Sequence, residues 1–182
     1  GDNRGFFFAR YPENTLEGKI VDQNVFYHVV GTSQDDDTLV YERPQEPEAS
    51  FGIGITEDKR YLLIYVHEGF DSNRIFIKDL ESEGAEVVEV FAKKDAHYSI
   101  IDNDGPLFWI QTDLGAPRYR VMTFDFSKFE GGDPELVELI GEADQPLESA
   151  GMLDNKFVLS YLQDAHTVVK IYDRQGHFVR NV

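Results

Sequence analysis

Short hydrophobic segments recur along this chain at a regular step, and three of them end in an aspartate. The three are Asp79, Asp125 and Asp173, which lie at steps of 46 and 48 residues. Each segment is rich in β-branched and aromatic residues and stops at Gly, Asp, Asn or Pro, the pattern of a short strand. A repeat of roughly 40 to 50 residues is typical of the four-stranded antiparallel blade of a β-propeller.

Four strands are predicted within each complete repeat. They are 51–56, 60–67, 73–79 and 86–92; then 97–102, 106–112, 119–126 and 135–140; then 147–153, 156–162, 167–173 and 177–182. Only three strands are predicted before residue 51, at 6–10, 24–30 and 38–42. No segment carries apolar residues at helical spacing over three turns, so little helix is expected.

The predicted fold is therefore all-β, a β-propeller fragment with three full blades and three strands of a fourth. An incomplete blade would occupy residues 1–50, and full blades would occupy 51–95, 96–145 and 146–182. The strands at Phe6–Arg10 and His177–Val182 would lie at sheet edges. Since unpaired edges attract other strands, edge-to-edge self-association is also expected.

Composition narrows the possible partners. Among 182 residues, 34 are acidic and 17 basic, which gives a net charge of −17, while 41% are hydrophobic. That apolar content is too high for a disordered acidic chain, and the charge argues against nucleic acid or an anionic membrane as partner. No apolar run approaches the roughly 18–20 residues of a membrane span, and no signal peptide is expected in this sequence. The absence of cysteine excludes disulfides and thiolate chemistry.

Polar clusters are expected to serve turns. Asp102–Gly105 resembles half of a calcium loop, but a hydrophobic strand follows where further ligands would be needed, so a hairpin turn is favoured. Asp35–Asp37 is predicted to be a solvated loop, and the repeating aspartates are predicted to accept hydrogen bonds from nearby backbone N–H groups. The five histidines form no His-Glu-x-x-His pair, and neither a metal nor a cofactor is expected.

A collinear set of segments resembles the prolyl oligopeptidase family of serine peptidases and covers essentially the whole chain. The segments are Gly5–Glu13, Val25–Thr32, Gln34–Asp37, Arg60–Leu62, Glu68–Asp71, Asn73–Arg74, Ala116–Arg120 and Tyr161–Ala165.

This resemblance implies the middle of a seven-bladed propeller that caps an α/β-hydrolase domain with a Ser-Asp-His triad. Such an enzyme, a prolyl endopeptidase, cleaves short peptides after proline, and its propeller keeps large proteins from the active site. The chain contains no Gly-x-Ser-x-Gly segment, because Ser149 in Glu148–Gly151 lacks the first glycine. No catalytic residue is therefore expected in this chain. The partners implied are proline-containing peptides and the hydrolase domain.

The resemblance also implies which residues line a substrate subsite. Phe7 and Phe70 match cavity-facing positions of the family, while Ser50 stands where a methionine is common and His67 where an arginine is common. Simple packing within a blade is the alternative for each of these side chains.

Two other functions stay open at this point. The chain could be a standalone blade-repeat module that binds a protein or peptide, or a propeller glycosidase that uses paired carboxylates. A soluble protein of the cytoplasm or the periplasm is expected, without a choice between the two.

Overall fold

The computed structural model describes residues 4–12, 21–69 and 71–182, and these residues form four antiparallel sheets. The first sheet has three strands, β1 (Gly5–Arg10), β2 (Asn24–Val29) and β3 (Thr38–Tyr41). The second has four, β4 (Ser50–Ile55), β5 (Tyr61–His67), β6 (Asn73–Asp79) and β7 (Val88–Phe91). Both sheets belong to a compact unit that ends at Ala92.

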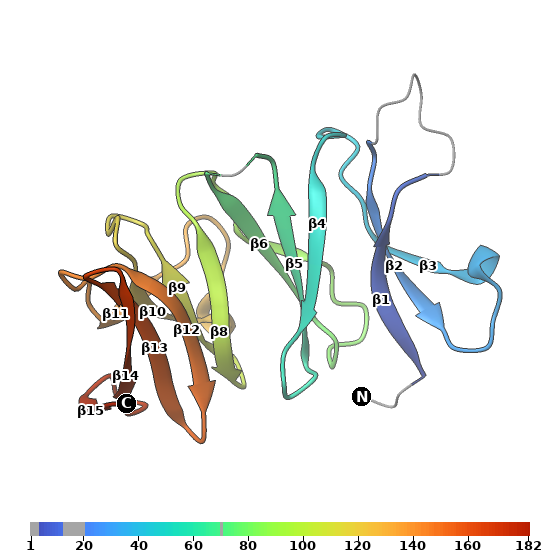
Figure 1. The fold of residues 1–182 in the computed structure, drawn as a ribbon. Coiled ribbons are helices and arrows are strands. Elements are labelled where there is room, and N and C mark those ends of the chain that lie inside the picture. Colours follow the sequence, from blue (N-terminus) through green and yellow to red (C-terminus); the bar gives the residue numbers. More distant parts are fainter. Residues whose placement is uncertain (1–3, 13–20, 70) are drawn as a thin grey trace. The chain divides into compact units, whose positions relative to one another are not determined.

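The second compact unit begins at Lys93 and holds the other two sheets. One contains β8 (Tyr98–Asp104), β9 (Leu107–Thr112), β10 (Arg120–Asp125) and β11 (Leu136–Ile140). The other contains β12 (Leu147–Leu153), β13 (Lys156–Gln163), β14 (His166–Tyr172) and β15 (Phe178–Asn181). Strands that follow one another in sequence pair in space in every sheet (Figure 1). The all-β prediction is confirmed.

Helix is confined to two single turns in the described part of the chain. These 3₁₀ turns cover Gln34–Asp36 and Phe126–Lys128. None of the helices described there has the length and apolar character needed to cross a bilayer.

The last strand pair of each sheet shifts register, near the start of β2, β6 and β10 in three sheets and at the end of β14 in the fourth. The shifts lie at Val25/Phe26, Ile75/Phe76, Val121/Met122 and Ile171/Tyr172. A bulge of this kind increases the local twist of a strand. The repeat predicted from hydrophobic runs therefore extends to an irregularity that the hydrophobic pattern does not reveal.

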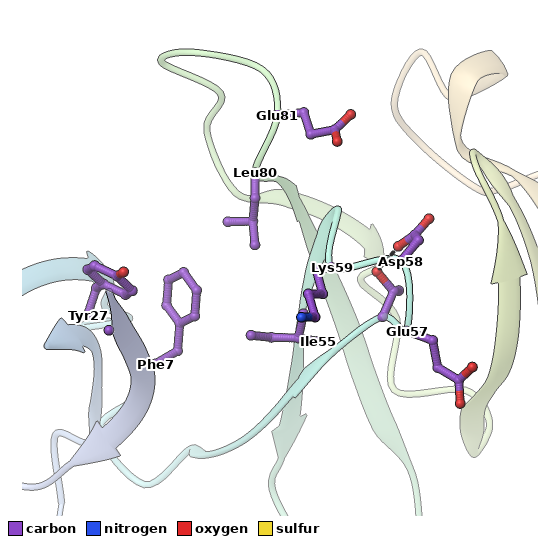
Figure 2. A pocket seen from close by; sticks show the side chains of 10 residues that line it. Phe7, Tyr27, Ile55, Glu57, Asp58, Lys59, Leu80 and Glu81 are labelled. Atoms are coloured by element: carbon purple, nitrogen blue, oxygen red, sulfur yellow. Dashed lines mark hydrogen bonds between the residues drawn. The ribbon is translucent and has the colours of Figure 1, made fainter. Parts of the chain in front are cut away.

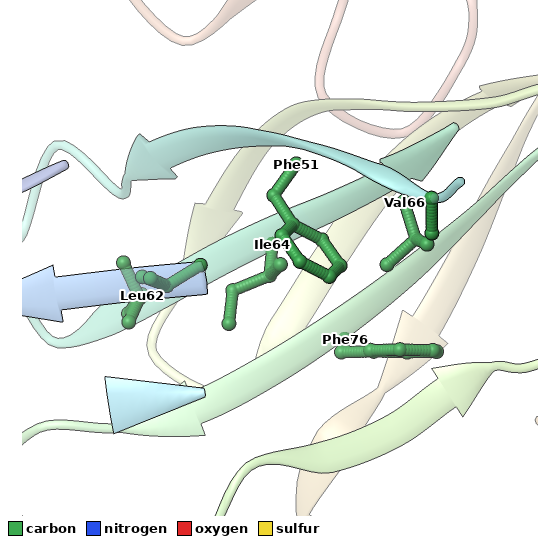
Figure 3. Close-up of a cluster of buried hydrophobic side chains, with 7 residues drawn as sticks. Phe51, Leu62, Ile64, Val66 and Phe76 are labelled. Carbon is green, nitrogen blue, oxygen red and sulfur yellow. The ribbon is translucent and has the colours of Figure 1, made fainter. Parts of the chain in front are cut away.

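The core of the first unit lies between its two sheets. Leu62, Ile64 and Val66 alternate along β5, so they project from one face, and all three are buried with Phe51 and Phe76 (Figure 3). Phe7 and Ala9 of β1 pack against this cluster. In the second unit a separate cluster centres on buried Trp109, Phe157 and Tyr161.

The turn predictions for aspartates are confirmed in all three repeats. Asp79 accepts a hydrogen bond from the backbone N–H of Glu81, Asp125 from that of Ser127, and Asp173 from that of Gln175. Gly105, with φ of +55°, turns the chain between β8 and β9, as predicted for a hairpin. No group of three metal-ligating side chains is found among the described residues.

The prediction that Asp35–Asp37 is a solvated loop is wrong for Asp37. Its side chain is 1% exposed, and its Oδ1 lies 2.7 Å from Nδ1 of His28, with Nη1 of Arg10 3.6 Å from Oδ2. The 3₁₀ turn capped by Ser33 directs this carboxylate toward β1 and β2. Partners on those strands offset the cost of burying it.

Candidate functional site

A cleft of about 840 Å³ opens in the first unit between β1–β2 and the turn that joins β4 to β5. Its apolar wall consists of Phe7, Tyr27, Ile55 and Leu80 (Figure 2). Ile55 is 47% exposed although it is large and apolar. A wall of this kind with a few polar groups at its margin is the usual chemistry of a small-ligand site.

Phe7 reaches the cleft because β1 alternates its side chains between two faces. The tilted rings of Phe6 and Phe8 lie together on one face, with centroids 5.9 Å apart, while Phe7 lies on the other, 4.9 Å from the ring of Tyr27. Gly5 makes room for that ring. A Cβ at this position would lie 2.6 Å from the Tyr27 ring and 2.1 Å from the carbonyl oxygen of His28.

The opposite wall is a hairpin turn with its own hydrogen-bond network. The backbone N–H of Lys59 donates to the carbonyl of Thr56 at 2.8 Å. Oδ1 of Asp58 accepts from the Thr56 hydroxyl at 2.5 Å and from the Arg60 N–H at 3.1 Å. Lys59 adopts φ of +62°, in the left-handed region that favours glycine.

Charged groups surround this turn. Arg60 donates from Nη2 to Oδ2 of Asp79 at 2.9 Å. Partial burial acts to raise the pKa of Asp79, but the hydrogen bonds from Arg60 and from the Glu81 N–H outweigh it, so its pKa lies below its usual value. The side chain of Lys59 extends along Ile55 toward the cleft, whereas the carboxylate groups of Glu57 and Glu81 point away from Phe7 (Figure 2).

Ser50 and His67 lie elsewhere in the first unit. They face each other across β4 and β5, and the Ser50 hydroxyl lies 3.5 Å from the carbonyl oxygen of His67. Ser50 begins β4, whereas the cleft is lined by Ile55 at the other end of that strand. The structure therefore brings Ser50 and His67 together but places Phe7 in a separate site. Phe70 lies outside the described residues.

A partly buried ionic network includes Glu68, the residue that follows His67. The guanidinium of Arg74, 4% exposed, pairs with the carboxylates of Glu46 and Glu68. Arg43 donates from Nη1 to Oε1 of Glu89 at 2.6 Å, and its Nε lies 3.0 Å from Glu46. Hydrogen bonds from Arg74 are the main reason that the pKa of Glu46 is held well below its usual range.

Sequence reasoning identified one residue of the cleft and missed the others. Tyr27, Ile55, Lys59 and Leu80 come from three segments that are remote in sequence. Only Lys59 carries a local signal, because a lysine occupies the end of a tight turn where glycine or asparagine is usual.

Comparison with known proteins agrees with this architecture. Four consecutive antiparallel sheets with local connections define the chain as β-propeller structure. The family model for the prolyl oligopeptidase N-terminal β-propeller domain matches residues 1–182, and the chain belongs to that family.

Relatives support the same assignment. Prolyl oligopeptidase A of Galerina marginata is 34% identical over 97% of this chain and 25% of its own length. Prolyl endopeptidase of Elizabethkingia meningoseptica is 29% identical over 99% of this chain and 26% of its own. The solved structure of prolyl oligopeptidase B from Galerina marginata, bound to a 35mer hydrolysis and macrocyclization substrate, superimposes with a TM-score of 0.89 at 30% identity. It covers 100% of this chain, which spans about a quarter of the length of these relatives.

Proposed function

We propose that this chain is the part of a prolyl oligopeptidase-like serine peptidase that limits access to the active site and lines a substrate subsite. The whole enzyme would cleave short peptides after proline. Family membership and the Phe7 cleft support this role. The bond chemistry would belong to the hydrolase domain of the parent protein, and this segment would act by exclusion and binding.

The same proposal assigns one blade to each sheet. The incomplete blade would span residues 1–50, and the full blades 51–95, 96–145 and 146–182. The sheet boundaries support this division to within one residue, since β8 and β12 begin at Tyr98 and Leu147 and β4 begins at Ser50, one residue before the proposed boundary.

The single observation that carries the subsite role is the pair of half-buried rings, Phe7 and Tyr27, which face an exposed Ile55 across an open cleft. Such a wall suits an apolar peptide side chain, because burial of both surfaces is favourable. Ser50 and His67 would contact a different part of the peptide, and Phe70 is proposed as a further substrate-binding residue on the ground of the family resemblance alone.

Titration of the ¹⁵N-labelled chain with an acetylated and amidated proline tetrapeptide that contains phenylalanine tests the role. Shifts of the amide signals of β1 and of the β4–β5 turn should give a dissociation constant near ~1 mM, the affinity of a small partial contact. Phe7→Ala should weaken binding severalfold, whereas Phe178→Ala, at an exposed ring of β15, should not. Equal binding by both variants would overturn the assignment of Phe7.

A further inference from the structure

One arginine connects the two segments that carry Ser50 and His67. The side chain of Arg74, on β6, is buried; its Nη1 donates to Oε1 of Glu46 at 3.2 Å, and its Nη2 pairs with the carboxylate of Glu68. Glu46 lies in the connection from β3 to β4, and Glu68 directly follows β5. A single guanidinium therefore ties the chain that enters β4 to the chain that leaves β5.

The path from Glu46 to Ser50 is short and hydrogen-bonded. The N–H of Glu46 donates to the carbonyl of Arg43 at 3.0 Å, and the N–H of Ala49 donates to the carbonyl of Glu46 at 3.0 Å. Ala49 is buried, so the backbone directly before β4 is packed as well. Because β4 begins at Ser50, a displacement of Glu46 would move that residue.

The path from Glu68 to His67 is shorter still, since the two residues are neighbours. His67 lies opposite Ser50 in the β4–β5 pair and opposite Asn73 in the β5–β6 pair. Arg74 is the next residue after Asn73 on β6. Its ion pair with Glu68 therefore closes where β5 ends and β6 begins, and it sets the direction in which the chain leaves His67.

The Arg74 guanidinium is itself held in place. Its Cζ lies 5.8 Å from the ring centroid of buried Phe76, and Cζ of Arg43 lies 5.4 Å from the same ring. Nε of Arg43 also lies 3.0 Å from Oε2 of Glu46. A planar guanidinium with several donors can bridge two carboxylates in one fixed geometry, which a lysine ammonium cannot do as well.

The equivalent arginine of the next sheet makes different contacts. Arg120 lies 46 residues after Arg74, which is the step of the repeat. It donates from Nη1 to Glu138 of β11 at 2.8 Å and from Nη2 to the carbonyl of Leu114, before β10, at 2.8 Å. Both partners belong to its own sheet or to a connection within that sheet. The bridge between two separate connections is therefore a feature of Arg74 and not of the repeat position.

We propose that Arg74 is a positioning residue of the substrate subsite, and that it holds Ser50 and His67 in place through Glu46 and Glu68. Its side chain is only 4% exposed, so its effect reaches a peptide through the two segments that it connects. This inference rests on the peptide-binding role proposed above for Ser50 and His67 and adds the residue that sets their geometry.

The first test replaces Arg74 by glutamine in the ¹⁵N-labelled chain. The proline tetrapeptide described above should bind about threefold more weakly to Arg74→Gln, a small coupling for residues of one network. In the free variant, ¹⁵N relaxation should show larger motions of the Ser50 and His67 amides than in the unchanged chain. The matched control is Arg120→Gln, which should leave both measurements unchanged.

A double-mutant cycle separates positioning from general stabilisation. In a background that carries Ser50→Ala and His67→Ala, Arg74→Gln should have no further effect on peptide binding, because the side chains that it positions are gone. In a Phe7→Ala background the full reduction of about threefold should persist, because Phe7 lies in a separate site. A purely stabilising arginine would reduce binding equally in both backgrounds.

Glu46→Gln keeps the test valid if Arg74→Gln does not fold. The side chain of Glu46 is 28% exposed, and glutamine can still accept a hydrogen bond from Arg74. This variant should weaken peptide binding in the same direction by a smaller factor.

The outcomes distinguish this inference from the proposed function. Unchanged peptide binding by Glu46→Gln and by folded Arg74→Gln would overturn the positioning role, as would an equal reduction in both backgrounds. In either case the proposed function would stand, because the unchanged chain still binds. A lack of binding by the unchanged chain would overturn the proposed function and this inference with it.

Discussion

The β4–β5 turn and the β12–β13 turn perform the same structural task in different chemical settings. The β12–β13 turn passes through Asp154 and Asn155, residues that suit left-handed backbone, and the neighbouring Leu153 is 73% exposed. The β4–β5 turn uses Lys59 and borders an aromatic cleft. The two turns therefore share a left-handed backbone and differ in what lies beside them: the β4–β5 turn borders the cleft, whereas the β12–β13 turn follows an exposed leucine.

Among the substitutions that test this comparison, Gly5→Ala is expected to have the largest effect on the stability of the first unit and on its cleft. The new Cβ would meet the His28 carbonyl, which cannot move without distorting β2, and the end of the Tyr27 ring, which would have to leave its place beside Phe7. We expect a loss of about 3 kcal/mol in the free energy of unfolding and loss of the cleft, measured by denaturant unfolding and by peptide titration.

Gly176→Ala provides the matched change in the second unit, where a Cβ would lie 2.5 Å from the carbonyl oxygen of Leu139. It should destabilise that unit and leave the amide signals of the cleft unchanged. If Gly5→Ala kept both stability and peptide binding, the close packing of Tyr27 over Gly5 would be refuted.

The next largest loss of stability is expected when an arginine is removed from the ion pairs of either unit. Arg74→Ala would leave the carboxylates of Glu46 and Glu68 without their buried partner and should cost about 2 kcal/mol, because both glutamates keep some contact with water. Arg120→Ala breaks the more exposed pair with Glu138 and should cost less than about 1 kcal/mol. Urea unfolding of both variants checks the order, and equal costs would contradict it.

A smaller effect on the free energy of unfolding is expected when the pH is lowered. The pKa of Asp79 lies below its usual value in the folded chain, so its contribution to stability is present above the unfolded pKa and is lost as pH falls through the folded pKa. Unfolding measured between about pH 6 and pH 2 should therefore show stability falling below about pH 4. Asp79→Asn should reduce the amount by which the free energy of unfolding falls for each unit of pH.

Asp173 offers the comparison in the second unit. Hydrogen bonds from the backbone N–H and the ring of His177 lower its pKa in the same direction, but this carboxylate is 36% exposed. Asp173→Asn should therefore change the acid slope less than Asp79→Asn, because solvent screens the exposed group. A larger effect of Asp173→Asn than of Asp79→Asn would contradict the expectation that the more buried carboxylate contributes more to the pH dependence of stability.

The smallest effect is expected at the outer strands β1 and β15. β15 is exposed along its length, and Phe178 and Val179 are 55% and 47% exposed. We expect edge-to-edge association of the chain with a dissociation constant near ~1 mM, weakened by Phe178→Glu. Sedimentation equilibrium that shows a strict monomer at such concentrations would rule it out.

The sequence alone determined the order of strands and the nature of the turns. Hydrophobic runs such as 60–67 and 156–162 predicted β5 and β13 to within one residue, since strand patterns depend on near neighbours in the chain. The same locality explains why Asp79, Asp125 and Asp173 were correctly assigned to turns, because each bonds a backbone N–H two residues away.

Tertiary structure decided everything that depends on contacts between distant segments. Asp37 is buried because β1 and β2 supply Arg10 and His28, and Phe7 lines a cleft because Tyr27 and Ile55 face it from other strands. A periodic pattern specifies which face a side chain takes, but the occupant of the facing position is set by packing of strands that lie tens of residues apart. Lys59 joins the two levels, since its left-handed turn is local, whereas the cleft that it lines depends on segments that are remote in sequence.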